Sequence, residues 1–84
     1  MFYTYVLHSM KDEDFCTGFT KNLKLRFEQH NKELVGSTKD KGPFKLIYYE
    51  TCLDQNDATR REKYFKTFHG KMFLRRRLKS YLTG

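Results

Sequence analysis

The chain has 84 residues, enough for one modest hydrophobic core, so we expect a single domain over residues 1–84. Lys and Arg outnumber Asp and Glu by 17 to 10, and the formal charge of +7 favours a polyanionic partner, nucleic acid before acidic lipid, although basic patches also merely keep small proteins soluble. The two cysteines form no zinc-ligand pattern and no apolar run has the length of a signal peptide core or a membrane span, so the sequence predicts a cytoplasmic protein with reduced thiols.

Three segments of the sequence predict β-strands. Residues 2–8, 15–20 and 44–50 are rich in aromatic and β-branched side chains, which favour strands. A polar turn joins the first two, so we expect them to pair as an antiparallel hairpin. Side chains alternate along a strand, so Tyr3 and Tyr5 share one face of the first strand. They are either core aromatics with hydroxyls at the edge of the core or hydroxyls available for chemistry.

A helix is predicted between the second and third strands. Thr20 or Asn22 can cap its first turn, and its end is expected near Leu34. Arg26 lies four residues before His30 and therefore next to it on the helix surface. This pair either binds a phosphate, with His30 adding a proton-transfer group, or is a solvated arginine beside a core histidine. The residues at helical spacing on one face are Leu23, Phe27, His30 and Leu34.

Glu62 is an acid inside the most basic part of the chain. From residue 59 to residue 84 there are nine Lys or Arg side chains and this one acid. The sequence predicts a helix over residues 57–68, and a carboxylate on its apolar face needs a partner. That partner is an intramolecular salt bridge to a nearby arginine, water or a metal ion. The residues that share this face with Glu62 are Ala58, Phe65 and Phe68.

The basic end of the chain predicts a last helix, from about residue 71 to residue 81. Its expected inward contacts are Met72, Leu78 and Tyr81, while residues 75–77, three arginines in a row, are at least partly solvated. Basic side chains along the chain are expected to contact a phosphate backbone. The candidates are Lys21, Lys24, Lys39, Lys63, Lys66, Lys71, Arg75 and Arg76.

These segments occur in the order and spacing of a known nuclease module. Tyr5 occupies the tyrosine slot of its first motif, and Arg26 ends the segment that carries its catalytic arginine. On six motifs in register, the chain resembles the GIY-YIG nuclease superfamily. More narrowly, it resembles small stand-alone bacterial members related to the N-terminal nuclease domain of the incision subunit of the ABC excinuclease. The matching segments are residues 3–7, 16–18, 20–26, 30–31, 37–39 with 43–50, and 58–66.

The resemblance implies an α/β fold, a small three-stranded antiparallel sheet flanked by about three helices. It also implies a metal-dependent DNA endonuclease that hydrolyses phosphodiester bonds in DNA repair or processing. A single Mg²⁺ or Mn²⁺ ion would be held by Glu62 with water completing the shell. Arg26 would clamp the phosphate and Tyr5 would position or activate water. His30 and Tyr3 are further acid or base candidates.

The second motif departs from the family pattern. Cys16 stands in place of its tyrosine, and Thr17 in place of the following aliphatic residue. A thiol accepts a proton near its usual pKa of about 8.5, but it is shorter than a phenol. Either Tyr3, Tyr5 or His30 takes over the base role, or the chain is a catalytically weakened nucleic-acid-binding module on the same scaffold. A lone domain has little surface for choosing a site, so a partner protein is a candidate source of specificity.

Overall fold

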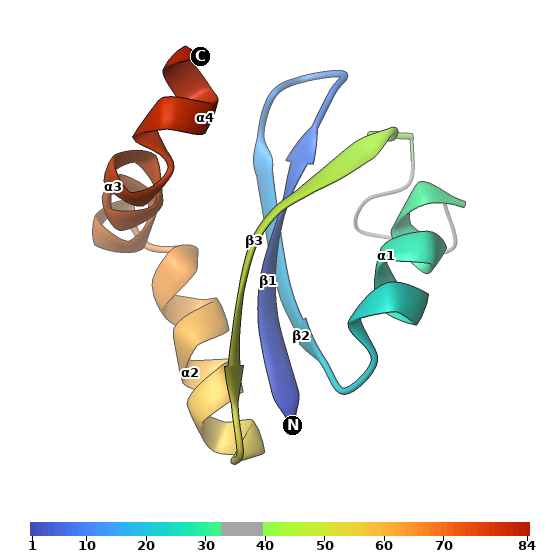
Figure 1. The fold of residues 1–84 in the computed structure, drawn as a ribbon, viewed down its shortest axis with the longest axis vertical. Coiled ribbons are helices and arrows are strands. Elements are labelled where there is room, and N and C mark those ends of the chain that lie inside the picture. Colours follow the sequence, from blue (N-terminus) through green and yellow to red (C-terminus); the bar gives the residue numbers. More distant parts are fainter. Residues whose placement is uncertain (33–39) are drawn as a thin grey trace.

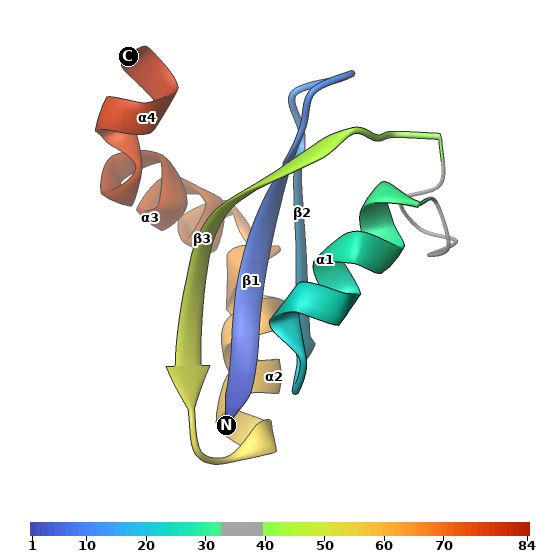
Figure 2. The same ribbon diagram turned by 45° about the vertical axis from the view of Figure 1, so that its right-hand side comes forward.

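The structure is a computed structural model that describes residues 1–32 and 40–84. It has a three-stranded antiparallel sheet in the order β2-β1-β3, with helix α1 on one side and helices α2, α3 and α4 on the other (Figures 1 and 2). The predicted Leu34 and Lys39 lie outside the described residues. The elements are β1 (Phe2–Ser9), β2 (Phe15–Thr20), α1 (Leu23–Asn31), β3 (Phe44–Cys52), α2 (Gln55–Phe65), α3 (Phe68–Arg77) and α4 (Lys79–Thr83).

The central strand β1 supplies both faces of the core. Tyr5 and Leu7 face α1, while Val6 faces α2 and α3, because successive side chains point to opposite faces of a strand. The α1 side is completed by Phe44 with Cys16, Leu23, Phe27 and Leu46. The other side is completed by buried Phe65 and Leu74 with Phe15, Ile47, Tyr48, Tyr64, Phe73 and Leu78. The three predicted strands and the hairpin are therefore confirmed, and β3 runs two residues further than expected, to Cys52.

Helix α1 begins where the sequence predicts and ends sooner. The Asn22 side chain accepts a hydrogen bond from the Leu25 backbone at 3.1 Å, so Asn22 rather than Thr20 is the N-cap. The helix ends at Asn31, whose side chain accepts a hydrogen bond from the Phe44 backbone N–H at 2.7 Å and so ties the helix end to β3. The prediction that this helix continues to about Leu34 is therefore wrong, because Lys32, the C-cap, is already outside the helix.

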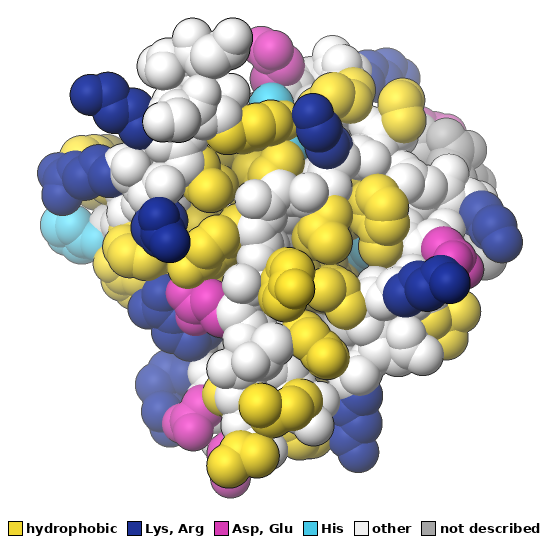
Figure 3. All heavy atoms as spheres, in the orientation of Figure 1, with side chains coloured by type: hydrophobic (Ala, Val, Ile, Leu, Met, Phe, Trp, Pro, Cys, Tyr) yellow, Lys and Arg dark blue, Asp and Glu magenta, His cyan; other side chains and the backbone are white. Residues whose placement is uncertain are grey.

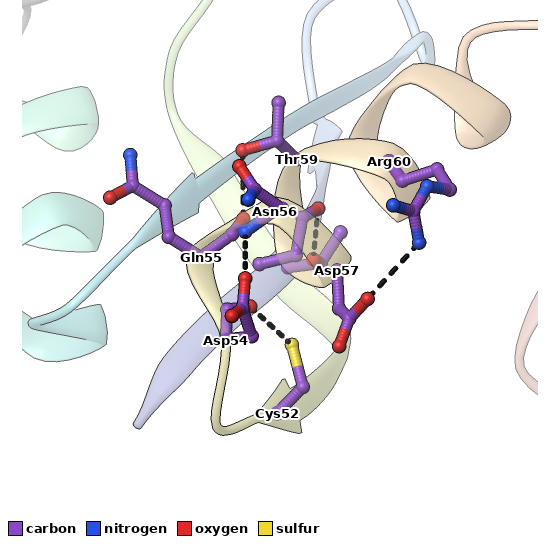
Figure 4. A network of polar contacts seen from close by, with 9 residues as sticks. Cys52, Asp54, Gln55, Asn56, Asp57, Thr59 and Arg60 are labelled. Carbon is purple, nitrogen blue, oxygen red and sulfur yellow. Dashed lines mark hydrogen bonds and ion pairs between the residues drawn. The ribbon is translucent and has the colours of Figure 1, made fainter.

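Polar contacts fix the start of α2, as Figure 4 shows from close by. The Asp54 carboxylate accepts a hydrogen bond from the Asn56 backbone at 2.7 Å and caps the helix. The Cys52 thiol lies 3.5 Å from the Asp54 carbonyl oxygen, and the Arg60 guanidinium lies 3.0 Å from the Asp57 carboxylate. An acid in the first turn also interacts favourably with the helix dipole. The helix consequently begins at Gln55, two residues before the predicted start.

The predicted end of one helix, at residue 68, and the predicted start of the next, at about residue 71, are both wrong. Helix α2 ends at Phe65, and Thr67 starts α3 as its N-cap by accepting a hydrogen bond from the Gly70 backbone at 3.1 Å. The turn carries Phe68 off the buried face that it was expected to share with Glu62, and Phe68 is 73% exposed. The chain bends again at Leu78, which separates α3 from the short helix α4.

A charged pair joins α2 to the edge strand β3. Two guanidinium nitrogens of Arg61 donate to the two carboxylate oxygens of Glu50 at 2.8 Å each, and the Tyr48 hydroxyl donates to the same carboxylate at 2.9 Å. The Arg61 guanidinium also lies 4.7 Å from the centre of the Phe65 ring. The hydrogen bonds from Arg61 lower the pKa of Glu50. This bidentate pair holds α2 against β3 at Arg61, the residue that precedes Glu62.

We expect the Glu50–Arg61 pair to make stability depend on acid pH. Because the folded pKa of Glu50 is lowered, its contribution is present above the usual carboxyl pKa of about 4.3 and is lost as the pH falls through the folded pKa. Glu50→Gln should therefore lower the free energy of unfolding near pH 7 by about 1–2 kcal/mol, with partial solvent exposure taken into account. In urea titrations the gap to wild type should narrow as the pH falls below about 4, and it should close once the pH is below the folded pKa.

The exposed Arg60–Asp57 pair provides the matched control, since its side chains are 75% and 57% exposed. Asp57→Asn should change the free energy of unfolding by less than about 1 kcal/mol. If the difference between wild type and Glu50→Gln stays constant from neutral to acid pH, the Glu50 carboxylate is not the group responsible.

No helix within residues 1–32 or 40–84 combines the length and the apolar character that crossing a membrane requires.

Candidate active site

A pocket of about 380 Å³ lies at the free edge of the sheet, beside β2. Side chains from both layers of helices reach it, because β2 is an edge strand with α1 on one face and α2 on the other. The volume falls within the range of small-molecule and substrate sites, about 300–1,000 Å³. The pocket is lined by Tyr5, Phe15, Cys16, Thr17, Gly18, Phe19, Arg26, His30, Glu62, Phe65, Lys66 and Lys71.

The hydroxyl of Tyr5 lies between two groups of α1. It is 2.9 Å from Nε2 of His30, and Nε of Arg26 donates to it at 3.4 Å. Gly18 is opposite Tyr5 in the strand register, and a side chain there would overlap the Tyr5 hydroxyl. Glycine is therefore required at this position so that the ring can cross β2 and reach the pocket. The structure brings together three of the predicted site residues: Tyr5, Arg26 and His30.

The protonation states of this group follow from burial. Burial raises the pKa of Tyr5, and the Arg26 guanidinium acts against that rise. Burial and then the positive charge of Arg26 lower the pKa of His30. At neutral pH the phenol is therefore protonated and the imidazole neutral. Because Arg26 donates to the Tyr5 oxygen, we assign the Tyr5 proton to the hydrogen bond with Nε2 of His30.

Glu62 enters the pocket from α2, with a side chain that is 17% exposed. Its partner is Lys66, whose ammonium lies 3.0 Å from one carboxylate oxygen, one helical turn along. The expected salt bridge thus exists, but to a lysine; the nearest arginine in sequence, Arg61, is held by Glu50. The Lys66 side chain is 58% exposed, and exposed pairs of this kind contribute only about 0.3–0.5 kcal/mol. Lys66 can therefore be displaced by a more strongly bound cation.

Cys16 lines the pocket but packs against the core on the α1 side. Burial raises the pKa of the Cys16 thiol, so at neutral pH it is neutral. The neighbouring Thr17 hydroxyl is buried without a hydrogen-bond partner among the described residues. Thr17 is not among the predicted site residues. The sequence does hold a signal for it, because Thr17 stands where the family motif has an aliphatic residue. A buried hydroxyl of this kind at a pocket wall is explained by water or a ligand.

Tyr3 does not line the pocket, although it lies on the same strand face as Tyr5. Its ring packs on Tyr49, with 5.9 Å between ring centres, and borders a separate groove with the predicted basic residues Lys21 and Lys24. The strand twists along its length, so side chains two residues apart reach different parts of one face. The structure therefore separates Tyr3 from Tyr5, Arg26 and His30.

The remaining predicted basic residues are distributed over α2 and α3. Lys66 and Lys71 line the pocket, and Lys63 is exposed on α2. Arg75 and Arg76, although adjacent, line two different hollows. Figure 3 shows Lys and Arg side chains along the side of the molecule formed by α2 and α3, beside a central band of hydrophobic side chains.

The donor set around the pocket fits one weakly ligated hard cation. Within residues 1–32 and 40–84 no group of three or more His, Cys, Asp or Glu side chains is placed to hold a metal ion. One carboxylate lines the pocket, that of Glu62, and Thr17, with its unsatisfied hydroxyl, lines the same pocket. Mg²⁺ keeps several waters and needs one or two carboxylates, so these residues fit Mg²⁺ and do not fit zinc.

Comparison with known proteins identifies the family. The model of the GIY-YIG catalytic domain matches residues 1–77. A UPF0213 protein of Clostridium perfringens is 40% identical over 67 residues, covering 79% of this chain and 71% of its own length. A UPF0213 protein of Pediococcus pentosaceus is 42% identical over 66 residues, covering 77% and 68%.

A solved structure agrees with the fold. The solution NMR structure of the UPF0213 protein BH0048 from Bacillus halodurans matches with a TM-score of 0.53 and 28% identity, over 88% of this chain and 82% of that one. The predicted α/β fold and the predicted resemblance are both confirmed. The chain is a member of the GIY-YIG catalytic domain family.

Proposed function

We propose that the protein is a metal-dependent DNA endonuclease that hydrolyses phosphodiester bonds. The single observation that carries the proposal is the convergence of Tyr5, Arg26, His30 and Glu62 on one pocket. Together they supply three groups that phosphodiester hydrolysis requires: Arg26 is the cation for the phosphate, the Tyr5–His30 pair is the proton acceptor, and Glu62 is the carboxylate. The net charge of +7 favours a polyanionic substrate.

Glu62 is the residue that would hold the ion, with water completing the shell. Mg²⁺ or Mn²⁺ bound there would stabilise negative charge on the phosphate and lower the pKa of a coordinated water. Lys66, which now occupies one carboxylate oxygen, would move into solvent. The metal dependence is thus a proposal that rests on the chemistry of this donor set.

Arg26 and the Tyr5–His30 pair would carry the protein's own part of the reaction. Arg26, with nitrogen donors in a planar fork, binds two phosphate oxygens and neutralises the charge that develops on them. A water that donates to the Tyr5 oxygen passes its proton there as the phenol proton moves to Nε2 of His30 over the existing 2.9 Å contact. His30 accepts that proton because its ring is neutral at neutral pH.

A second candidate function is a nucleic-acid-binding module of weakened activity, and Cys16 favours it. The thiol stands where the family motif has a tyrosine, and its pKa is raised by burial, so it supplies neither a phenol nor a thiolate. On this alternative the pocket binds phosphate without cleaving the strand. Both functions are compatible with this fold and this net charge, and one DNA-nicking assay distinguishes them.

Arg26→Gln tests the endonuclease directly, with Lys24→Gln as the matched control. Both residues are basic and lie on α1. The sequence predicts a phosphate contact for Lys24 as well, but in the structure Lys24 is exposed and borders the groove with Tyr3 rather than the pocket. We expect wild type to nick supercoiled plasmid with Mg²⁺ and not with EDTA. Arg26→Gln should lower the rate by about 100-fold, the usual loss when one stabilising donor is removed. Lys24→Gln should stay close to the wild-type rate.

The same measurements show which proposal fails. Equal loss in the two variants would mean that charge alone matters, and unchanged nicking in Arg26→Gln would point to a contaminating nuclease. Salt-sensitive DNA binding without nicking by wild type would support the binding module. We propose that the activity belongs to DNA repair or processing, as the family resemblance implies. We also propose that a partner protein supplies specificity, because a domain of 84 residues offers little surface for reading a sequence.

A further inference from the structure

A second hollow, of about 710 Å³, adjoins the candidate active site. Phe15 and Lys71 line both, so the two hollows share a wall formed by β2 and α3. None of the chemistry proposed above uses this second hollow. Its lining combines the groups that bind a nucleotide: cations, aromatic rings and acceptors.

The cations of this hollow come from one face of α3. Lys71 and Arg75 are four residues apart and therefore neighbours on the helix surface. The Arg75 guanidinium lies 5.9 Å from the centre of the Phe15 ring, which directs it toward the wall shared with the active site. A phosphate backbone leaving the first pocket past Lys71 would meet Arg75 next.

The aromatic rings of the hollow are held in place by one another. The His8 ring lies edge-on to Phe15 and to Tyr81, with 5.6 Å between ring centres in each case. Nδ1 of His8 is 2.8 Å from the Tyr81 hydroxyl, and Lys45 lies 5.2 Å from the centre of the Tyr81 ring. Tyr81 nevertheless remains 37% exposed. A fixed and partly exposed ring is a platform on which a base can stack.

The acids Glu13 and Asp14 complete the lining. Their carboxylates would repel a phosphate, so the hollow is not built to bind anions alone. Carboxylates accept hydrogen bonds from the exocyclic amino groups of bases, as they do from cytosine N4. Cations and acids in one hollow are what a nucleotide requires, because its phosphate and its base differ in chemistry.

We propose that this second hollow binds the nucleotide adjacent to the one whose phosphate occupies the active-site pocket. Lys71 and Arg75 hold its phosphate, and its base stacks on Tyr81. This inference rests on the proposed function for its substrate but concerns binding alone. A base reaches the ring only when it is unpaired and unstacked, so the preferred substrate is single-stranded or frayed next to the bound phosphate.

Arg76 provides the control for Arg75. The two residues are adjacent, exposed and equal in charge. The sequence predicts a phosphate contact for both, but in the structure Arg76 lines another hollow, formed by Tyr64, Phe68, His69, Met72, Phe73 and Arg77, so the nucleotide site includes Arg75 and not Arg76. Binding of fluorescent single-stranded oligodeoxycytidine should be followed by anisotropy in EDTA, where no cleavage occurs. Arg75→Gln should weaken binding about tenfold and reduce the salt slope by about one, while Arg76→Gln should have little effect on either.

The Tyr81→Leu variant tests whether a base stacks on the Tyr81 ring. Wild type should bind oligodeoxycytidine about tenfold more tightly than an abasic strand of the same length and charge, and Tyr81→Leu should lose most of that difference. A thermal melt checks that α4 is still in place, and the Arg75 and Arg76 variants test the site independently of α4. Equal effects of these two variants, or no difference between the strands in wild type, would overturn the proposal. If wild type shows these differences but nicks no DNA, the endonuclease fails and the nucleotide site stands.

Discussion

A Glu62→Gln variant is expected to fold and to bind DNA, yet to lose metal-dependent nicking by a factor on the order of 10³. The amide keeps the size and hydrogen-bonding ability of the side chain but removes the charge that a divalent ion needs. The lost contact with Lys66 costs little, because that lysine is 58% exposed. Plasmid nicking in Mg²⁺ and in Mn²⁺ measures the rate, and chemical denaturation verifies the fold.

Metal binding gives a readout that does not depend on cleavage. Free Mn²⁺, counted by its paramagnetic resonance signal, should fall when wild type is added and remain high with Glu62→Gln. Glu28→Gln is the control, since Glu28 lies on α1 and does not line the pocket. If Glu62→Gln binds Mn²⁺ as wild type does, Glu62 is not the ligand, whatever the nicking rate.

Short-range patterns in the sequence predicted most of the fold. The strands follow from runs of aromatic and β-branched residues, and α1 from its cap at Asn22. Arg26 and His30 share a helix face by spacing alone, and the structure places both at the Tyr5 hydroxyl. Such features depend on neighbours within one element, which a sequence displays directly.

Features that depend on contacts between elements were not predictable. The helical pattern of Phe65 and Phe68 continues across the point where Thr67 caps a new helix, so the break is invisible to periodicity. The predicted partner of Glu62 was a nearby arginine, but Arg61 pairs with Glu50 of β3, and Lys66, one turn along α2, pairs with Glu62 instead. The second hollow joins His8 to Tyr81 from opposite ends of the chain, and nothing local in the sequence indicates that contact.

Gly70→Ala provides the sharpest test of these contacts between helices, because propensity and packing predict opposite signs. Gly70 lies inside α3, where alanine is favoured over glycine by about 1 kcal/mol. A methyl group at this position would overlap the Tyr64 carbonyl group and lie 2.7 Å from Cα of Phe65, both part of the α2 backbone. Backbone cannot turn aside as a side chain can, so α3 would have to move away from α2.

We therefore expect Gly70→Ala to lower the free energy of unfolding by about 2–3 kcal/mol in urea titrations, in spite of the better helix former. Gly42→Ala is the matched control, since within residues 1–32 and 40–84 its added methyl group would meet Phe44 alone, at an ordinary 3.8 Å, and should change stability by less than about 1 kcal/mol. Lys71 directly follows Gly70 and lines both hollows, so displacement of α3 should weaken DNA binding as well. A Gly70→Ala protein more stable than wild type would show that α2 and α3 are not in this close contact.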